Sequence, residues 1–441
     1  MRPSASRRYE IRDPVYGFIG YNDLERDIIN SKPFQRLRRI KQLAMTHLVY
    51  PGAVHTRFEH GLGTMEIATR AFDILAERHR DLLSALLGWD AEEMPRAKQV
   101  LRLGALLHDV GHAPFSHGPE DLLPPTVKNH EEFTKRFLMD ASSELHQILL
   151  GHRGPFNTRP EDVAIVALGP RKLQTDDIGL HFLGELVAGS IGVDRMDYLV
   201  RDSLHTGVAY GRFDYQRLLY TLTLGEAPNT RAPTLAVEEG GLQTLEGLLL
   251  ARYFMFQQMY YHDVRAVYDI HLREFLQAIL PEGHLPESLE DYLQWDDPRV
   301  EEEIRQAELD ERHPGHNAAQ PLTGRRHFRL ACELTSQDLA GRPSLFQELW
   351  EAALGSFPSE AIRQWSSNMG SASVGASIPT EEIWIKSDDG QLADVLNRSE
   401  LVQQLPTISK WRVYSRVDVR SAIEHFTRTY VRAKLGGPTS V

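Results

Sequence analysis

Residues 106–117 read Leu106-Leu107-His108-Asp109-Val110-Gly111-His112-Ala113-Pro114-Phe115-Ser116-His117 and join the end of an apolar helix to a cluster of metal-binding residue types. The predicted helix is apolar nearly all round at residues 104–107, which indicates that its end lies inside the core. An adjacent histidine and aspartate in the last turn of such a helix present a nitrogen and an oxygen ligand to one ion. Burying this pair without an ion or hydrogen-bonding partners would be costly. The segment therefore predicts a metal site, and the alternative is a satisfied core histidine beside a C-terminal turn.

The first two-thirds of the chain has the apolar periodicity of helices. One stripe at spacings of three and four consists of Leu62, Met65, Ala68, Phe72 and Leu75. A second segment begins at Pro95 and runs to Gly111, since proline favours the start of a helix and glycine its end. These patterns predict a mainly α fold.

Strand patterns interrupt the helical ones later in the chain. Residues 234–237 and 242–244 flank a glycine pair and predict a short hairpin. Near the C-terminus we expect a small-residue loop at 369–377, strands at 382–386 and 411–415, and a helix at 421–434. The sequence therefore predicts a helical bundle followed by a smaller C-terminal α+β domain.

The two predicted domains are separated by an acidic run from Glu287 to Glu311. We place a boundary there, with a core at residues 1–290 and an accessory domain at 291–441. The run itself is typical of a solvated helical face between domains.

Composition excludes several classes of protein. The chain has 441 residues, of which 41% are hydrophobic, as in globular proteins. Its 49 basic and 61 acidic residues give a net charge of −12, which opposes non-specific coating of nucleic acid.

Cys332 is the only cysteine, so no intrachain disulfide is expected and a cytoplasmic location is favoured. The basic start is followed by Tyr9-Glu10-Ile11-Arg12-Asp13 and not by an apolar stretch, so we expect no signal peptide. The richest apolar run, residues 245–256, is interrupted by two charged residues and is too short to span a membrane, so we expect no membrane span.

A metal site needs ligands from other segments, and two candidates stand out. His60 opens the striped helix, where a capping or core histidine is the alternative interpretation. Asp194 begins a second helical pattern, so that Tyr198 and Asp202 share its face at spacings of four. The residues alone leave open whether this face lines a cleft or meets water.

Several motifs together carry a resemblance to a known family. They are Phe34–Leu43, Tyr50-Pro51-Gly52-Ala53, Arg57-Phe58-Glu59-His60, His108-Asp109, residues 111–117 and residues 194–202. In this order and spacing they resemble the HD-domain phosphohydrolases and, more narrowly, the deoxynucleoside triphosphate (dNTP) triphosphohydrolases. The resemblance runs from about residue 10 to about residue 275 and implies an HD-domain helical bundle.

The resemblance implies one divalent metal ion, with four ligands: His60, His108, Asp109 and Asp194. Two nitrogen and two oxygen ligands suit manganese, iron or magnesium, and zinc remains an alternative. The resemblance also implies that the chain hydrolyses a dNTP to a deoxynucleoside and tripolyphosphate.

Further residues match the family's active site. The implied catalytic histidines are His112, His117 and His130, of which the last two would protonate the leaving oxygen or position the water. The implied substrate contacts are Arg57, Arg195 and Arg252 for phosphate, Tyr198 against the 2′ carbon, Gln42 and Asp202 for the 3′ hydroxyl, and Tyr260 near the base.

Other partners and other functions are also weighed. Related enzymes form tetramers or hexamers, so the resemblance predicts a homo-oligomer. A nucleotide effector is a second expected partner, although Asn30 replaces the family's guanine-binding aspartate. Phe256 replaces a histidine of the family, so phosphate or base contacts are expected to differ there. The alternative functions are an HD phosphodiesterase or nucleotidase, and a nucleotide-sensing or weak single-stranded nucleic-acid-binding protein. A pure binding module has no need for all four metal ligands, which weighs against the latter.

Overall fold

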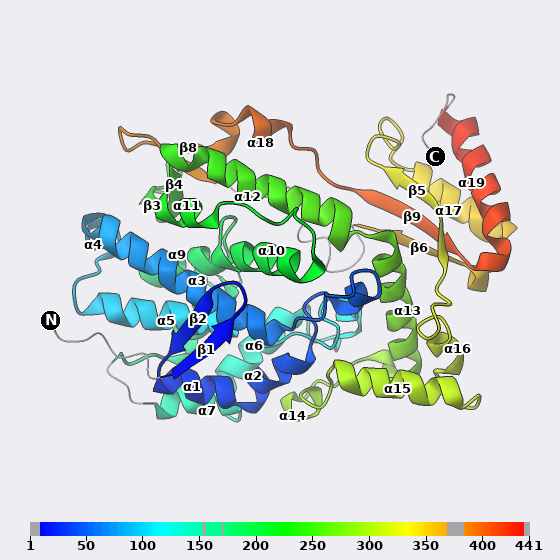
Figure 1. Cartoon of the computed structure of the whole chain (residues 1–441), viewed down its shortest axis with the longest axis horizontal. Helices are drawn as coiled ribbons and strands as arrows, with labels where there is room; N and C mark the ends of the chain where they lie inside the picture. Colours follow the sequence, from blue (N-terminus) through cyan, green and yellow to red (C-terminus); the bar gives the residue numbers. More distant parts are fainter. Residues whose placement is uncertain (1–8, 153–155, 170–171, 368–382, 436–441) are drawn as a thin grey trace.

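The centre of the molecule is a bundle of helices in which distant segments of the chain pack side by side. The computed structural model describes residues 9–152, 156–169, 172–367 and 383–435. Helix α3 (Arg57–Arg78) packs on α5 (Glu93–Leu107) and α10 (Val193–Thr206). Helix α8 (Pro160–Leu168) packs against both α5 and α9 (Ile178–Ala188). Figure 1 shows α3, α5, α9 and α10 gathered in this bundle. The predicted mainly α fold is confirmed.

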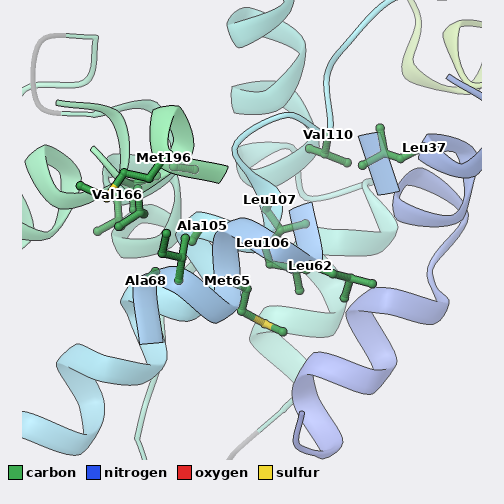
Figure 2. Close-up of a cluster of buried hydrophobic side chains, with 14 of the residues drawn as sticks. Leu37, Leu62, Met65, Ala68, Ala105, Leu106, Leu107, Val110, Val166 and Met196 are labelled. Carbon is green, nitrogen blue, oxygen red and sulfur yellow. The ribbon is translucent and has the colours of Figure 1, made fainter. Parts of the chain in front are cut away.

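The bundle core is built from the predicted apolar stripes. Figure 2 shows side chains from α3, α5, α8 and α10 that meet there. Its labelled residues, each at most 2% exposed, are Leu37, Leu62, Met65, Ala68, Ala105, Leu106, Leu107, Val110, Val166 and Met196. Every residue of α5 from Val100 to Leu107 is buried, because neighbouring helices surround it. The end of this helix therefore lies inside the core, as predicted.

Two glycines let helices approach the His-Asp segment closely. A Cβ atom on Gly104 would lie 2.5 Å from Val166 Cγ1 in α8. A Cβ atom on Gly111 would lie 2.3 Å from the backbone of both His130 and Thr134 in α6 (His130–Met139). The helix ends at Leu107 and not at Gly111, so the expectation that the His-Asp pair lies in its last turn is wrong. The pair follows the helix directly, and Gly111 serves the contact with α6.

Shorter elements surround the bundle. Strands β1 (Tyr9–Asp13) and β2 (Gly17–Tyr21) form an antiparallel hairpin. The helices around the bundle are α1 (Asp23–Asn30), α2 (Lys32–Arg36), α4 (Arg80–Leu87), α7 (Glu144–Gly151) and α11 (Tyr215–Tyr220). Helix α12 (Leu242–Met255) continues through a π-helical turn, η5 (Phe256–Tyr260), towards α13 (Asp263–Ile279). None of the helices in the described part of the chain is long and apolar enough to cross a bilayer.

The predicted hairpin around Gly240-Gly241 is wrong. Strand β4 (Pro233–Glu238) pairs antiparallel with the earlier strand β3 (Leu222–Glu226) and parallel with β7 (Trp384–Lys386), which pairs with β8 (Leu392–Asp394). Residues 242–244 begin α12 instead. A Cβ atom on Gly241 would lie 2.2 Å from Thr221 Oγ1, so this glycine permits close packing and does not form a hairpin turn.

The C-terminal region has its own small core. Strands β5 (Arg329–Thr335), β9 (Lys410–Ser415) and β6 (Ile362–Ser366) form an antiparallel sheet in that order. Helices α17 (Leu345–Ser356) and α19 (Arg420–Leu435) pack with it around a second hydrophobic cluster. The smaller α+β unit, the predicted strands β7 and β9 and the predicted C-terminal helix are confirmed. The expected loop at 369–377 falls outside the described residues.

The acidic run lies against the larger core. It contains α14 (Leu289–Tyr292) and α15 (Asp297–Leu309), and α16 (His316–Ala319) follows. Val300, Ile304 and Ala307 of α15 belong to the large hydrophobic cluster, so only one side of this helix is a solvated face. The domain boundary between residues 290 and 291 stays a prediction.

The close approach at Gly104 predicts opposite effects for two glycine-to-alanine substitutions. Gly104→Ala should lower the free energy of unfolding by about 1–3 kcal/mol, because the new methyl group overlaps Val166. The new methyl group of Gly247→Ala in α12 would meet only the Phe213 Cβ atom, at 3.7 Å. This substitution should raise the free energy of unfolding by about 0.5–1 kcal/mol through helix propensity. Urea unfolding of both variants measures the difference. Equal effects of the two substitutions would contradict the tight packing of α5 on α8.

Candidate metal centre

Four side chains from three helices converge beside the bundle core. His60 lies in the first turn of α3, whose start is fixed by a capping box between Thr56 and Glu59. His108 and Asp109 directly follow α5, and Asp194 lies in the first turn of α10. The structure thus brings together the four ligands that the resemblance implies; their role as ligands stays a prediction.

The distances between the donor atoms fit one shared ion. His60 Nε2 lies 3.2 Å from His108 Nε2 and 3.1 Å from Asp194 Oδ1. His108 Nε2 lies 3.4 Å from Asp109 Oδ1 and from Asp194 Oδ1. Ligand atoms about 2.1 Å from one metal ion are separated by roughly 3.0–3.4 Å. The donor atoms of His60, His108 and Asp109 therefore lie close enough together to hold one divalent cation, and Asp194 Oδ1 lies within 3.4 Å of both histidines.

A buried layer of hydrogen bonds orients the two histidines. His60 Nδ1 donates to Asp197 Oδ2 at 2.7 Å, and His108 Nδ1 donates to the Ala105 carbonyl at 2.8 Å. Both Nε2 atoms are thereby directed to the centre, as in established metal sites. Asp197 is held in turn by two hydrogen bonds from Arg201, which also donates to Asp13 at 2.8 Å.

The electrostatics of the four groups favour positive charge at the centre. Burial would lower the pKa of His60, but hydrogen bonds to Asp194 and Asp197 raise it to about 10. The pKa of His108 is also raised, against burial, mainly by the charge of Asp109. Burial opposes ionisation of Asp194, yet its hydrogen bonds to both histidines hold its pKa well below the ordinary value. Protons and a divalent cation would therefore compete for the same atoms.

The three predicted catalytic histidines form a second cluster next to the first. The His112 and His130 rings stack with centroids 3.6 Å apart, and His117 stands edge-on to both. His112 Nε2 lies 3.3 Å from Asp109 Oδ1, so the two clusters share that aspartate. Glu120 accepts hydrogen bonds from Nδ1 of His117 at 3.0 Å and of His130 at 2.6 Å. One carboxylate therefore orients the His117 and His130 rings together.

Arg57 connects the metal centre to the turn after α5. Its Nη1 donates to Asp109 Oδ2 and its Nε donates to Ser116 Oγ at 2.8 Å. The Arg57 side chain is buried, so its charge acts at short range on Asp109, whose pKa is lowered in spite of burial. A buried guanidinium beside a metal ligand is well placed to meet phosphate oxygens.

The residues predicted to contact the sugar and base lie along α10 and the π-helical turn. Tyr260 donates to Asp202 Oδ2 at 2.7 Å, and its ring stands edge-on to that of Tyr198. His55 Nε2 donates to the other oxygen of Asp202 at 2.8 Å. Gln42 is joined to this group through its backbone, which donates to the His55 carbonyl at 3.0 Å. Within the described residues its Oε1 atom is buried without a hydrogen-bond partner.

The two remaining predicted phosphate contacts flank Tyr198. Burial raises the pKa of Tyr198, and the positive charges of Arg252 and Arg195 oppose that rise, which places both cations near the ring. Arg195 Nη1 donates to the Gly189 carbonyl, so this arginine is partly engaged by the backbone. Arg252 is buried over the Phe256 ring, and its Nε has no hydrogen-bond partner in the described part of the chain.

Six residues that position the side chains of this site were not predicted from the sequence. They are Asp13, His55, Ser116, Glu120, Asp197 and Arg201. Three carried a local signal, because Glu120 is three residues from His117, Asp197 is three from Asp194, and Arg201 is four from Asp197. Asp13, His55 and Ser116 lie far along the chain from the partners they bind, so no spacing rule finds them.

Two family models match the chain. One describes the HD domain and matches residues 57–201, which include all four candidate ligands. The other describes the HD associated region and matches residues 213–348.

Known proteins are similar over most of the chain. The uncharacterized protein YwfO of Bacillus subtilis (strain 168) is 35% identical over 266 residues, covering 60% of this chain and 54% of that protein. The deoxynucleoside triphosphate triphosphohydrolase SAMHD1 of Danio rerio is 30% identical over 292 residues, covering 60% of this chain and 44% of that protein. The chain thus spans about half the length of the curated relatives it matches.

A solved structure extends the similarity to nearly the whole chain. A hypothetical protein from Aquifex aeolicus is 31% identical, with a TM-score of 0.75 over 95% of this chain and 99% of that one. Together with the two matched regions, this places the protein among the HD-domain phosphohydrolases. Three vertebrate proteins named deoxynucleoside triphosphate triphosphohydrolase SAMHD1 are 29–30% identical to this chain and are matched over less than half of their own length.

The hydrogen bond to His60 predicts a specific effect of Asp197 on metal affinity. Asp197→Asn should weaken manganese binding about 10–100-fold, because the amide supports the His60 orientation less well than a carboxylate. Asp13→Asn is the matched control, since Asp13 contacts the same Arg201 but not the histidine. Titration followed by electron paramagnetic resonance measures both affinities. An equal loss in the two variants would show that Asp197 acts only through Arg201.

The raised histidine pKa predicts that metal binding depends on pH. A pKa of about 10 means that His60 holds a proton at pH 7, which an incoming ion must displace. Manganese affinity should therefore rise by at least about tenfold per pH unit between pH 6 and pH 8, with proton release on binding. Titrations in unbuffered solution with a pH indicator count the protons. A pH-independent affinity without proton release would contradict this electrostatic description.

Proposed function

We propose that this protein is a metal-dependent hydrolase that cleaves dNTPs to a deoxynucleoside and tripolyphosphate. The observation that carries the proposal is that two clusters of side chains meet at Asp109. The four candidate metal ligands lie on one side of it, and His112, His117 and His130 lie on the other. Relatives named deoxynucleoside triphosphate triphosphohydrolase at about 30% identity support the choice of substrate.

In this proposal the metal centre would supply Lewis-acid catalysis. A divalent ion held by His60, His108, Asp109 and Asp194 would polarise a phosphoryl oxygen and lower the pKa of a bound water. Manganese, iron or magnesium suits the mixed nitrogen and oxygen donors. Arg57 would bind phosphate oxygens next to the metal centre, and Arg195 and Arg252 would bind the charge farther along the triphosphate.

The histidine cluster supplies proton transfer. Burial lowers the pKa of His117 although Glu120 opposes the shift, which favours the neutral imidazole, the form that can act as a general base. The Glu120 carboxylate would then stabilise the imidazolium that forms. His130 shares the same carboxylate and would position the water or donate to the leaving oxygen.

The sugar and base would lie along α10 in this arrangement. The Tyr198 ring would pack against the 2′ carbon and leave no room for a hydroxyl group. Asp202 would accept a hydrogen bond from the 3′ hydroxyl while His55 and Tyr260 hold its orientation. The homo-oligomer, the nucleotide effector and the cytoplasmic location stay predictions.

Product analysis tests the proposal directly. Purified protein with manganese and each dNTP should yield deoxynucleoside and tripolyphosphate on chromatography. His117→Ala should lower kcat about 10²–10⁴-fold through loss of proton transfer, whereas His181→Ala on the exposed face of α9 should leave it unchanged. Release of monophosphate and pyrophosphate, or turnover only of cyclic nucleotides or monophosphates, would contradict the proposal.

A further inference from the structure

One residue of the acidic run is buried against the candidate active site. Asp297 is the first residue of α15 and lies in the HD associated region, yet only 1% of its surface is exposed. Its neighbour Asp296 caps the helix by accepting from the Arg299 amide and pairs with Arg39 near the surface. The role of helix cap is therefore already filled, and Asp297 needs another explanation.

The Asp297 carboxylate ties two segments of the HD region together. One oxygen accepts from the Phe115 amide at 2.6 Å and the other from the Lys41 amide at 2.9 Å. The Lys41 ammonium lies 3.8 Å away and pairs more closely with Glu301 at 2.7 Å. Burial raises the pKa of Asp297 to about 7, and the hydrogen bonds from the Phe115 and Lys41 amides oppose that rise.

Asp297 holds a turn with unusual backbone geometry. Phe115 has φ +53° and Ser116 has φ +58°, which is the left-handed region that residues with a side chain rarely adopt. Two consecutive residues in this region persist only where surrounding contacts fix them. The Asp297 bond to the Phe115 amide is one such contact, and the Ser116 hydroxyl, which donates to the Lys41 carbonyl at 2.6 Å, is another.

The Phe115–Ser116 turn also fixes Arg57, the arginine beside the metal centre. Ser116 Oγ uses its proton on Lys41 and therefore presents a lone pair to Arg57 Nε at 2.8 Å. The Arg57 amide also donates to the Ile40 carbonyl at 3.0 Å, next to Lys41. The guanidinium that reaches Asp109 is thus oriented by the two segments that Asp297 joins.

We propose that Asp297 is a positioning residue, through which the HD associated region holds the Phe115–Ser116 turn and sets the Arg57 guanidinium against Asp109. The arrangement itself does not depend on the reaction. Its catalytic consequence rests on the proposed function, in which Arg57 binds the triphosphate.

The substitution Asp297→Asn tests the proposal with little change in the shape of the side chain. An amide has one acceptor oxygen, so Asp297→Asn keeps one backbone hydrogen bond and turns an N–H group towards the other amide. The Arg57 Nε–H resonance, assigned by its disappearance in Arg57→Lys, should exchange with water at least about tenfold faster in Asp297→Asn. Asp296→Asn is the matched control, because it keeps the cap oxygen and does not touch the turn, and its exchange should equal that of the native protein.

A second variant and a kinetic measurement complete the experiment. Ser116→Ala removes the acceptor at the other end and should accelerate the same Arg57 exchange even if Asp297→Asn folds poorly. An unchanged exchange rate of the Arg57 Nε–H proton in either variant would overturn the inference, whatever the activity.

If native protein hydrolyses dNTPs, Asp297→Asn should lower kcat/KM about tenfold. In the Arg57→Lys background it should cause no further loss, and additive losses would overturn the inference. If native protein hydrolyses no dNTP while the exchange results hold, the proposed function fails and the positioning role stands.

Discussion

The structure depends on the cost of placing two imidazoles and the Asp109 carboxylate in the interior beside the bundle core, with the partly exposed Asp194 next to them. Unpaired, each group would strongly oppose folding, because the interior cannot replace its hydration. The bundle meets this cost by bringing opposite charges within 3.1–3.4 Å of one another and by backing His60 with the Asp197–Arg201 pair. The ends of α3, α5 and α10 are consequently arranged around this one point.

Much of this centre could be predicted from the sequence, because its signals are local or carried by motifs. The His108-Asp109 pair stands out at the end of an apolar helix, and helical periodicity places His60 and Asp194 at the starts of two others. The mainly α fold follows from the same periodicity. The pairing of β4 with β3 and β7 was missed, because a strand's partners depend on chain crossings that a single glycine pair does not reveal.

The positioning residues were missed for a different physical reason. A charge run shows that a helix is solvated on average, but it does not show which acid faces the protein. Asp297 is chemically like the exposed acids of the same run and differs from them in the two backbone amides that the fold brings to it. His55 and Ser116 likewise act through partners more than fifty residues away in sequence. Such contacts become visible only when the chain is folded.

The layout of the four donors also has a mechanical consequence. His60 and Asp194 lie at the starts of α3 and α10, and residues 108–109 lie directly after the end of α5. A shared cation would therefore cross-link the ends of these three helices. Occupancy would then favour the folded chain by mass action, with melting temperature following the free cation concentration. Stability and catalytic readiness would rise and fall together.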